Sequence, residues 1–367
     1  MNMITNKSVT PICHINKRES GIELLRIIAA LFVIVLHYCN GDLGEALNYV
    51  AKGSINEYSL FFFRSLSACA VNVFIVISGY YLCYTNKRTW DKPIYLILQL
   101  ILFRLLYYIV TSYLLGNAIT LRMVLIQFLP KNYFVVLYLA LYIISPYVNM
   151  AILQLNKIQY VKLLMVVVLL FSIWPLIIDV LSSYFGISDF GLSTIGAWGS
   201  QHGYTLVNFI LLYIIGAYLR LYVDMDHVPF NKAIIHVIIC VLGVFFWSLF
   251  EIKIMLLPEA NCALAYNNPF VIVMAASLFV IFKKIDISCS WINNLAGAAF
   301  TCYLIHGYFI HHIKISFFVQ QNIAIMLLHL VFAPTMIYII SWLVYKMFYW
   351  FINPLLSYFK KPIISNV

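Results

Sequence analysis

Charged side chains are scarce in this chain of 367 residues. Asp, Glu, Lys and Arg make up 10% of it, whereas hydrophobic residues make up 64%. Ordinary soluble proteins carry about 25% charged residues, so the composition excludes a soluble domain. The net charge of +10 does not indicate nucleic-acid binding, because the basic residues are spread through short loops between hydrophobic runs. The sequence therefore indicates an integral membrane protein whose partners include lipid but no nucleic acid.

Other common signatures are missing as well. The first 20 residues are polar, and the hydrophobic run after them has no small-residue cleavage site, so it is a signal anchor rather than a cleaved signal peptide. The eight cysteines show neither a disulfide framework nor a metal-binding spacing. A Cys39–Cys69 bridge is possible, although most buried cysteines are small apolar residues. We find no low-complexity segment and no internal repeat, and we expect no metal site.

Ten hydrophobic segments are long enough to cross the roughly 30 Å of hydrocarbon as helices. They lie at 22–40, 65–84, 93–115, 132–153, 160–182, 204–222, 232–250, 269–285, 292–313 and 323–351. The run at 119–130 is too short to span, and we expect it at the interface. The fold class is therefore an all-α membrane bundle of about ten helices. It divides into a tail at 1–21, a transmembrane domain at 22–351 and a tail at 352–367.

Lysine and arginine are distributed unevenly between alternate loops. With the N-terminus in the cytoplasm, fifteen fall on the inner side: Lys7, Lys17, Arg18, Lys87, Arg88, Lys92, Lys157, Lys162, Arg220, Lys232, Lys283, Lys284, Lys346, Lys360 and Lys361. Six fall on the outer side: Lys52, Arg64, Arg122, Lys131, Lys253 and Lys314. Because cytoplasmic loops are enriched in these residues, the bias places both termini in the cytoplasm.

The first hydrophobic segment carries polar groups that lipid disfavours. In "LLRIIAALFVIVLHY" (24–38), Arg26 and His37 fall within about 20° of one helix face and about 16 Å apart along the axis. Glu23 lies within about 40° of the same line. A snorkelling arginine and a buried, hydrogen-bonded histidine would be the structural explanation. An ionisable group at membrane depth is costly, however, so we take Arg26 and His37 as functional candidates.

A second histidine is expected at the depth of His37. His306, in "AFTCYLIHGYFIHH", lies as far along another inside-to-outside segment, so both reach about 22 Å from the inner face. Because a polar group facing lipid is unfavourable, we predict that the two rings lie close together, on opposite walls of one outward-facing cavity. Two such imidazoles would disfavour double protonation, which leaves one able to act as a base. The alternative is that His306 is bonded only within its own packing.

Further polar residues gather toward the outer ends of the segments. Those considered for substrate contact are Asn72, Asn132, Tyr133, His202 and Asn268. Each also has a structural explanation, since aromatic belts and helix caps occur at any membrane interface. Gly79 is better explained by close helix packing. Arg104, about 17 Å from the inner face, is a functional candidate because of its depth, although a buried partner would give it a structural role.

These positions suit a reaction that joins the two sides of a membrane. Arg26, with Lys87 and Arg88, could hold a phosphate from the cytoplasm, because a guanidinium offers a planar fork of donors. His37 could then remove a proton from an acceptor hydroxyl. Coenzyme A has the matching form, with phosphates at one end and a thioester at the tip of a long arm. The oxyanion of such a reaction needs a donor, which Tyr133, Asn72 or His306 could supply.

Several segments resemble the acyltransferase family 3 membrane proteins. "RESGIELLRIIAALFVIVLH" is similar to the first-helix signature of that family, an Arg followed by ten residues and a His. "VNVFIVISGYYL" resembles its second helix and "CYLIH" its penultimate helix. "NYFVVLYLALYIISPYVN", "HGYTLVNFILLYIIGAYLR" and "YNNPFVIV" resemble segments of the polysaccharide-modifying branch. The likeness runs from about residue 18 to 350.

The resemblance implies an O-acetyltransferase of a bacterial inner membrane. Its donor would be cytoplasmic acetyl-CoA, with no permanently bound cofactor, and its acceptor a surface polysaccharide or its lipid-linked precursor. Arg26 and His37 would be the essential pair, and Glu23 stands where relatives have Asp. From their positions alone, Glu23, His306 and Tyr133 are further catalytic candidates. The paired-arginine motif of many relatives is replaced by "NKRTWDKPIYLILQLILFRLL". Lys87, Arg88 or Arg104 would then take its place in binding acyl-CoA.

Two other functions also fit ten helices with buried polar residues. A transporter or flippase for a lipid-linked glycan would be expected to show internal repeats or broken helix pairs, and the sequence shows neither. A glycan polymerase would be expected to have a long outer loop. Thioester cleavage of labelled acetyl-CoA by the purified protein separates the enzyme from the transporter. The sequence does not indicate the oligomeric state.

Overall fold

A computed structural model describes residues 19–40, 43–85, 87–186, 193–196 and 199–356. The long helices are α1 (Ser20–Cys39), α3 (Ile55–Ser67), α4 (Ala70–Leu82), α5 (Asp91–Leu114), α7 (Tyr133–Leu153), α8 (Lys157–Val168), α9 (Trp174–Phe185), α10 (Leu206–Tyr222), α11 (Phe230–Leu249), α13 (Pro269–Lys283), α15 (Ala299–Ile310) and α17 (Ile323–Leu356). The short ones are α2 (Ala46–Tyr49), α6 (Leu121–Gln127), η2 (Gln201–Gly203), α12 (Asn261–Leu264), α14 (Ser290–Ala296) and α16 (Ile315–Val319). Two π-helical turns, η1 (Leu169–Ile173) and η3 (Phe250–Ile254), complete the order.

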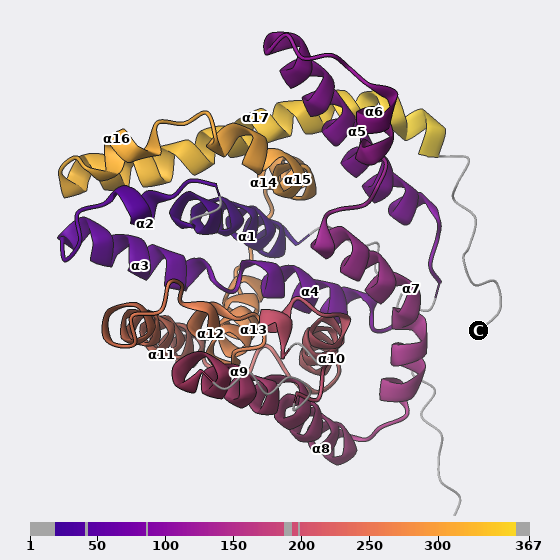
Figure 1. The fold of residues 1–367 in the computed structure, drawn as a ribbon. Helices are drawn as coiled ribbons and strands as arrows, with labels where there is room; N and C mark the ends of the chain where they lie inside the picture. The colour runs from indigo at the N-terminus through magenta and orange to yellow at the C-terminus, as the bar shows by residue number, and fades with distance from the viewer. Residues whose placement is uncertain (1–18, 41–42, 86, 187–192, 197–198, 357–367) are drawn as a thin grey trace, which may run out of the picture.

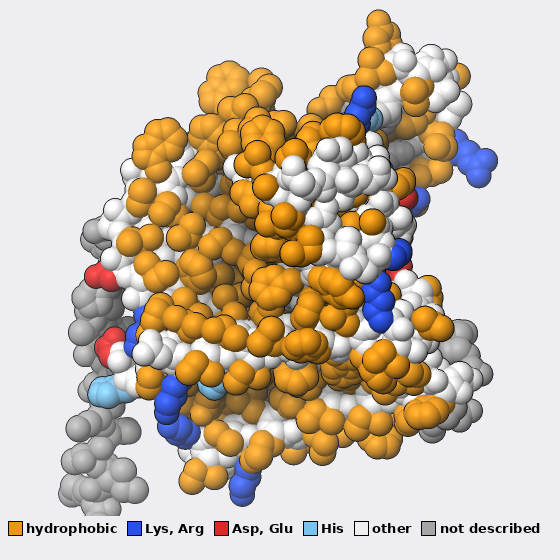
Figure 2. Space-filling model, turned by 90° about the vertical axis from the view of Figure 1, so that its left-hand side faces the viewer, with side chains coloured by type: hydrophobic (Ala, Val, Ile, Leu, Met, Phe, Trp, Pro, Cys, Tyr) orange, Lys and Arg blue, Asp and Glu red, His pale blue; other side chains and the backbone are white. Residues whose placement is uncertain are grey.

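The protein is a multi-pass all-α membrane protein. Within the described residues, eight helical stretches are long and apolar enough to cross a membrane, and α10 and α15 are shorter apolar helices. Together they overlap the ten expected segments, with different boundaries. Hydrophobic side chains cover most of the face in Figure 2, with lysine and arginine in a few separate places, as expected for a surface in contact with lipid.

Two spans differ from the sequence expectation because they are interrupted. The second extends from Ile55 to Leu82, ten residues earlier than expected, and breaks between α3 and α4, which follow one another in Figure 1. The side chain of Ser54 caps the start of this span by accepting a hydrogen bond from the backbone N–H of Glu57. The first turn is therefore polar, and the hydropathy pattern did not include it in the span. The ninth breaks at Gly297, where a Cβ atom would come within 2.8 Å of the Tyr345 hydroxyl. Broken helices, which the sequence did not reveal, are therefore present.

The fifth span contains the π-helical turn η1 between α8 and α9. Pro175 follows directly at the start of α9 and has no N–H to continue the α-helical pattern, which accounts for the wider turn. The Ser172 hydroxyl in η1 donates to the carbonyl of Asn267 at 2.6 Å. This bond ties the span to the loop before α13, which forms part of the site described below.

The main hydrophobic core surrounds α4, which packs against α10, α13 and α1 (Figure 1). A second core joins α1 to α3, α15 and α17. Helix α1 thus lies between the two cores and contributes to both, which fixes the orientation of its polar side chains. Cys39 and Cys69 are both free and buried, so the Cys39–Cys69 bridge is absent.

The contact between α4 and α10 depends on two glycines. A Cβ atom on Gly79 would lie 2.1 Å from the carbonyl oxygen of Tyr213, and one on Gly216 would lie 2.2 Å from that of Val76. Small residues at facing positions let helix backbones approach closely. The expected packing role of Gly79 is confirmed.

We expect Gly79→Ala to destabilise the protein by about 1–3 kcal/mol, because an added methyl group would force the two backbones apart. The apparent melting temperature of the purified protein in detergent measures this. Gly196→Ala is the matched control, since nothing lies within 4 Å of a Cβ atom there. Equal melting temperatures for the two variants would show that the helices separate without cost.

Candidate active site

The outer cavity is a space of about 590 Å³ at the end of the bundle where α1 finishes. We call this the outer end and the opposite end, where α1 begins, the inner end. Of the residues expected at the site, five line the cavity: His37, Asn132, Tyr133, His202 and His306. They come from α1, the start of α7, the turn before α10, and α15. Segments far apart in the sequence therefore contribute polar groups to one space.

The rings of His37 and His306 contact each other, and both residues line the outer cavity. Their ring centroids are 4.9 Å apart and the rings are tilted by 38°. The predicted closeness of these residues is confirmed. His306 is buried, whereas His37 is partly exposed to the cavity, so any group bound beside the pair reaches His37 more readily.

The hydrogen bonds of the two rings differ. His306 Nδ1 lies 3.1 Å from the carbonyl oxygen of Cys302, one helical turn earlier. A carbonyl only accepts, so Nδ1 carries the hydrogen and the Nε2 of the neutral ring is an acceptor. His37 Nδ1 is buried without a hydrogen-bond partner among the described residues. No described contact therefore fixes the tautomer of His37.

Tyrosines form much of the remaining wall. The Tyr133 hydroxyl donates to that of Tyr266 at 3.3 Å, and the Tyr204 ring makes edge contacts with both rings at 4.7 and 4.8 Å. The Tyr303 hydroxyl donates to Asn132 Oδ1, which also caps α7. The wall thus combines flat aromatic faces with hydroxyl and amide groups, as ligand pockets commonly do.

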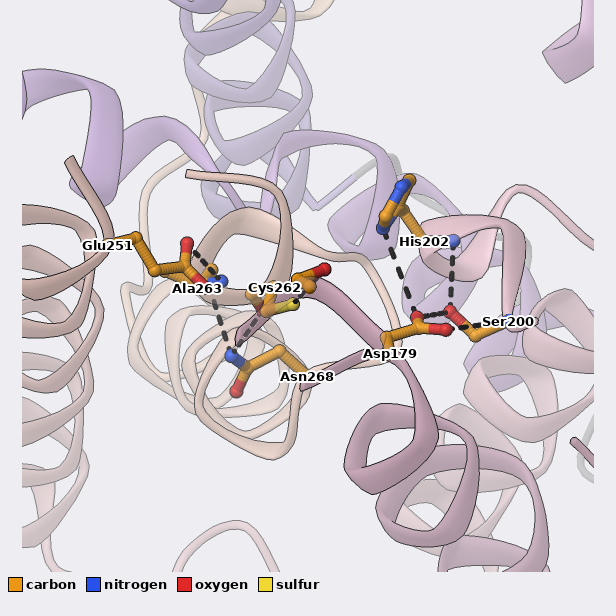
Figure 3. A network of polar contacts seen from close by, with 8 residues as sticks. Asp179, Ser200, His202, Glu251, Cys262, Ala263 and Asn268 are labelled. Carbon is orange, nitrogen blue, oxygen red and sulfur yellow. Dashed lines mark hydrogen bonds and ion pairs between the residues drawn. The ribbon is translucent and has the colours of Figure 1, made fainter. Parts of the chain in front are cut away.

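His202 is held by a turn with an unusual backbone. Gly199, Gln201, His202 and Gly203 all have φ between +50° and +81°. The hydroxyl and backbone N–H of Ser200 donate to the Asp179 carboxylate, and the His202 N–H donates to the Ser200 hydroxyl at 2.9 Å (Figure 3). His202 Nδ1 lies 3.9 Å from Asp179. Asp179 therefore fixes the turn that brings His202 to the cavity.

Asn72 and Asn268 lie behind the wall rather than in it, and both are fully buried. Asn72 Nδ2 donates to the carbonyl of Tyr266 at 2.8 Å. Asn268 caps α13 and donates to the carbonyls of Cys262 and Ala263 (Figure 3). Their contacts favour structural roles over the expected contact with substrate.

Arg26 and Glu23 form an ion pair near the inner end of α1, with 3.2 Å between Arg26 Nη1 and Glu23 Oε1. The Arg26 side chain is 37% exposed and that of Glu23 is 9% exposed. Glu23 thus orients a guanidinium that still has free donors. Arg26 and His37 lie on the same uninterrupted helix, with the spacing that their positions predict.

The basic residues expected to support Arg26 are placed differently. Lys87 is exposed in the loop between α4 and α5. Arg88 is fully buried, and its nitrogens donate to the Ser145 hydroxyl, to the Leu82 carbonyl at the end of α4 and to two carbonyls of the loop that follows. Arg104 donates to Ile126, Gln127 and Leu129 at the end of α6, four to seven residues before α7 begins at the outer end. The side chains of Arg88 and Arg104 thus donate hydrogen bonds to carbonyl oxygens at or just after helix ends, which favours structural roles for both.

Two functional candidates, a basic pair and a single arginine, were missed from the sequence. Arg220 contacts the Tyr80 ring at 5.0 Å and donates to its hydroxyl, and Lys283 lies 5.4 Å from the same ring, at the inner ends of α10 and α13. The only indication of this pair in the sequence was that both residues belong to the basic residues of the inner side. The second candidate is Arg64, which lines the outer cavity. It was placed in a loop because the expected span began at residue 65.

The comparison with protein families matches an acyltransferase domain over residues 19–346. The chain belongs to this family. The acyltransferase fold therefore accounts for nearly the whole membrane part, and the expected family membership is confirmed. No curated protein matches the acyltransferase, and no solved structure matches it.

We expect cysteines at positions 37 and 306 of the acyltransferase to be joined by a short thiol crosslinker, in a background without other cysteines. The 4.9 Å between the ring centroids is the reason. The shift of the protein on a denaturing gel after proteolysis between the two helices measures the link. A pair at 37 and 312 is the control, because His312 is exposed and does not line the cavity. Equal linking of both pairs would contradict the arrangement.

Proposed function

We propose that this membrane acyltransferase moves an acetyl group from cytoplasmic acetyl-CoA to a sugar hydroxyl of a surface polysaccharide or its lipid-linked precursor, in a bacterial inner membrane. One observation carries the proposal. The paired histidines lie in a polar, aromatic cavity at the outer end of α1, and the oriented guanidinium of Arg26 lies toward the inner end of the same helix.

The donor fits the two ends of α1. Arg26 would hold a phosphate of CoA, because its fork of donors matches phosphate geometry. Arg220 adds positive charge at the inner end, where Lys283 is ion-paired with Glu19. The pantetheine arm would then carry the thioester along α1 to the outer cavity, over the roughly 16 Å between Arg26 and His37.

The reaction would follow from the cavity geometry. His37 removes the proton of the acceptor hydroxyl as that oxygen bonds to the acyl carbon. The carbon–sulfur bond then breaks, and the same proton passes to the departing CoA thiolate. Of the three oxyanion donors considered, Asn72 is buried behind the wall and His306 uses its N–H within α15. We assign this role to Tyr133, which lines the cavity and whose hydroxyl would turn from Tyr266 to the oxyanion.

The aromatic wall supports a carbohydrate acceptor. Tyr133, Tyr204, Tyr266 and Tyr303 offer flat apolar faces beside hydroxyl groups. A sugar ring has the same combination of an apolar face and a polar edge. The cavity volume of about 590 Å³ lies within the usual range of roughly 300–1,000 Å³ for small-molecule sites.

The broken helices also occur in transporters. Here the break between α3 and α4 falls at Ala68, which lines the cavity, and α15 begins at the other break and carries His306. The breaks thus shape the same site that the acyltransferase reaction would use. The family assignment favours acyl transfer over transport as the activity that they serve.

Purified protein in nanodiscs, labelled acetyl-CoA and a lipid-linked glycan test the proposal. We expect base-labile label in the glycan and free CoA in equal amounts. Mass spectrometry of the surface glycan from cells with and without the gene identifies the modified sugar. Flipping of the glycan without cleavage of acetyl-CoA would replace the proposal with transport, and transfer from longer acyl-CoA alone would correct the donor.

A further inference from the structure

Arg64 is a basic residue of the outer cavity that the proposed reaction does not use. It lies on α3 and lines the same space as His37 and His306. Cys39 Sγ, at the end of α1, contacts the Leu60 carbonyl at 3.9 Å, and Arg64 follows Leu60 by one helical turn. Because α3 runs opposite to α1, Arg64 and His37 differ by only about 3 Å in depth.

Arg64 differs from the other arginines of the described spans. Arg26 pairs with Glu23, and Arg220 bonds the Tyr80 hydroxyl. Arg88 and Arg104 bond hydroxyl or carbonyl oxygens. Within the part of the chain that the structure describes, Arg64 has neither a hydrogen bond nor an ion pair within 4 Å. A cation at membrane depth is costly unless a partner balances it.

The acidic residues near Arg64 do not supply that partner. Glu251 and Glu259 lie near enough to attract the Arg64 guanidinium electrostatically, but neither forms a close ion pair with it among the described contacts. Glu251 is fully buried and accepts hydrogen bonds from the Tyr184 hydroxyl and the Ala263 N–H. Glu259 lines the cavity and is exposed to solvent. The guanidinium of Arg64 is therefore left facing a polar cavity with its donors available.

We propose that Arg64 binds a carboxylate of the acceptor, which makes the acceptor an acidic sugar such as a uronic acid. The inference rests on the proposed function, because it places the carboxylate beside the hydroxyl that reacts at His37. A guanidinium grips a carboxylate through two parallel hydrogen bonds, so it would orient the sugar ring as well as hold it. One arginine matches a single negative charge, whereas a doubly charged phosphate usually meets several cations.

Matched pairs of sugars test this subsite. The probes are methyl glucuronide against methyl glucoside, and methyl galacturonide against methyl galactoside, which differ only at the carboxylate carbon. Binding to the purified protein is measured by saturation-transfer NMR without acetyl-CoA, and acetyl transfer is measured separately. We expect the parent to prefer the acidic member of a pair. Arg64→Gln should reduce that preference by about 10- to 100-fold, as expected for hydrogen bonds to a charged group.

Arg64→Lys should keep part of the preference, because the charge stays while the fork is lost. Arg122→Gln on α6 is the matched control, since Arg122 is exposed and does not line the cavity. It should keep the full preference of the parent. The binding measurement contains no donor, so it stays readable even if the protein does not cleave acetyl-CoA, which would refute only the proposed function.

Three results would overturn the inference. The first is that the parent binds no acidic probe, or binds both members of each pair equally. The second is that Arg64→Gln lowers binding and transfer equally for acidic and neutral sugars, which would give Arg64 a role in the reaction common to all acceptors. The third is that Glu259→Gln restores the preference lost in Arg64→Gln, which would make Arg64 a counter-charge for Glu259.

Discussion

Replacement of His37 by alanine is expected to lower acyl transfer by about 10²–10⁴-fold, the usual contribution of a general base. His37 is the more accessible ring of the histidine pair in the outer cavity. Its Nδ1 has no hydrogen-bond partner among the described residues, so the variant loses no described hydrogen bond there and should still insert and accumulate. Transfer of label from acetyl-CoA to glycan, normalised to protein in the membrane, measures the effect.

His312→Ala is the matched control for this variant. His312 lies just beyond the end of α15, is exposed, and does not line the cavity, so its loss should leave transfer unchanged. His306→Ala should also reduce transfer, since it removes the neighbouring ring. Near-normal transfer by His37→Ala would remove His37 from the mechanism, and a fall of equal size in His312→Ala would point to a general effect on the protein.

Arg26→Ala is expected to weaken acetyl-CoA binding by about 10- to 100-fold, because it removes hydrogen bonds to a charged group. Arg26→Lys should bind more weakly than the parent too, since a point charge does not reproduce a two-pronged grip on phosphate. Glu23→Gln should have a smaller effect through the lost orientation of Arg26. Equilibrium binding of labelled acetyl-CoA to the purified protein measures all three.

Lys157→Ala is the control, as Lys157 is an exposed cation at the start of α8, also at the inner end. It should bind acetyl-CoA like the parent. If both Arg26 variants bind acetyl-CoA normally and lose only glycan acetylation, then Arg26 acts on the reaction and not on the donor.

Most of the fold follows from hydropathy, because lipid allows only stretches whose backbone bonds are satisfied internally. The positions of the spans were predicted on this basis. The breaks at Ala68 and Gly297 could not be, because they depend on which atoms of another helix approach the backbone. The early start of α3 was missed because its capped first turn, Ser54 to Glu57, is polar.

The site was predictable where depth and helical period decide it. Depth in the membrane and helical period can both be read from neighbouring residues of one segment. They correctly predicted that Arg26 and Glu23 share a helix face and that His37 lies level with His306. The roles of Arg88 and Arg104 depend on helix ends that meet them only in the folded chain. The turn that holds His202 has four residues in the left-handed region, and only two of them are glycines. The sequence therefore did not indicate this backbone conformation.

The fixed length of helix α1 limits which acyl donors can react. The helix is continuous from Ser20 to Cys39 and lies between two hydrophobic cores, so the distance from Arg26 to His37 is rigid. Under the proposed function, a donor must carry its acyl group about 16 Å from its anchored phosphate. Acetyl phosphate, whose acyl group is bonded directly to the phosphate, is too short to be held at one end and to react at the other. The same rule sets a minimum arm length for any inhibitor that occupies both ends at once.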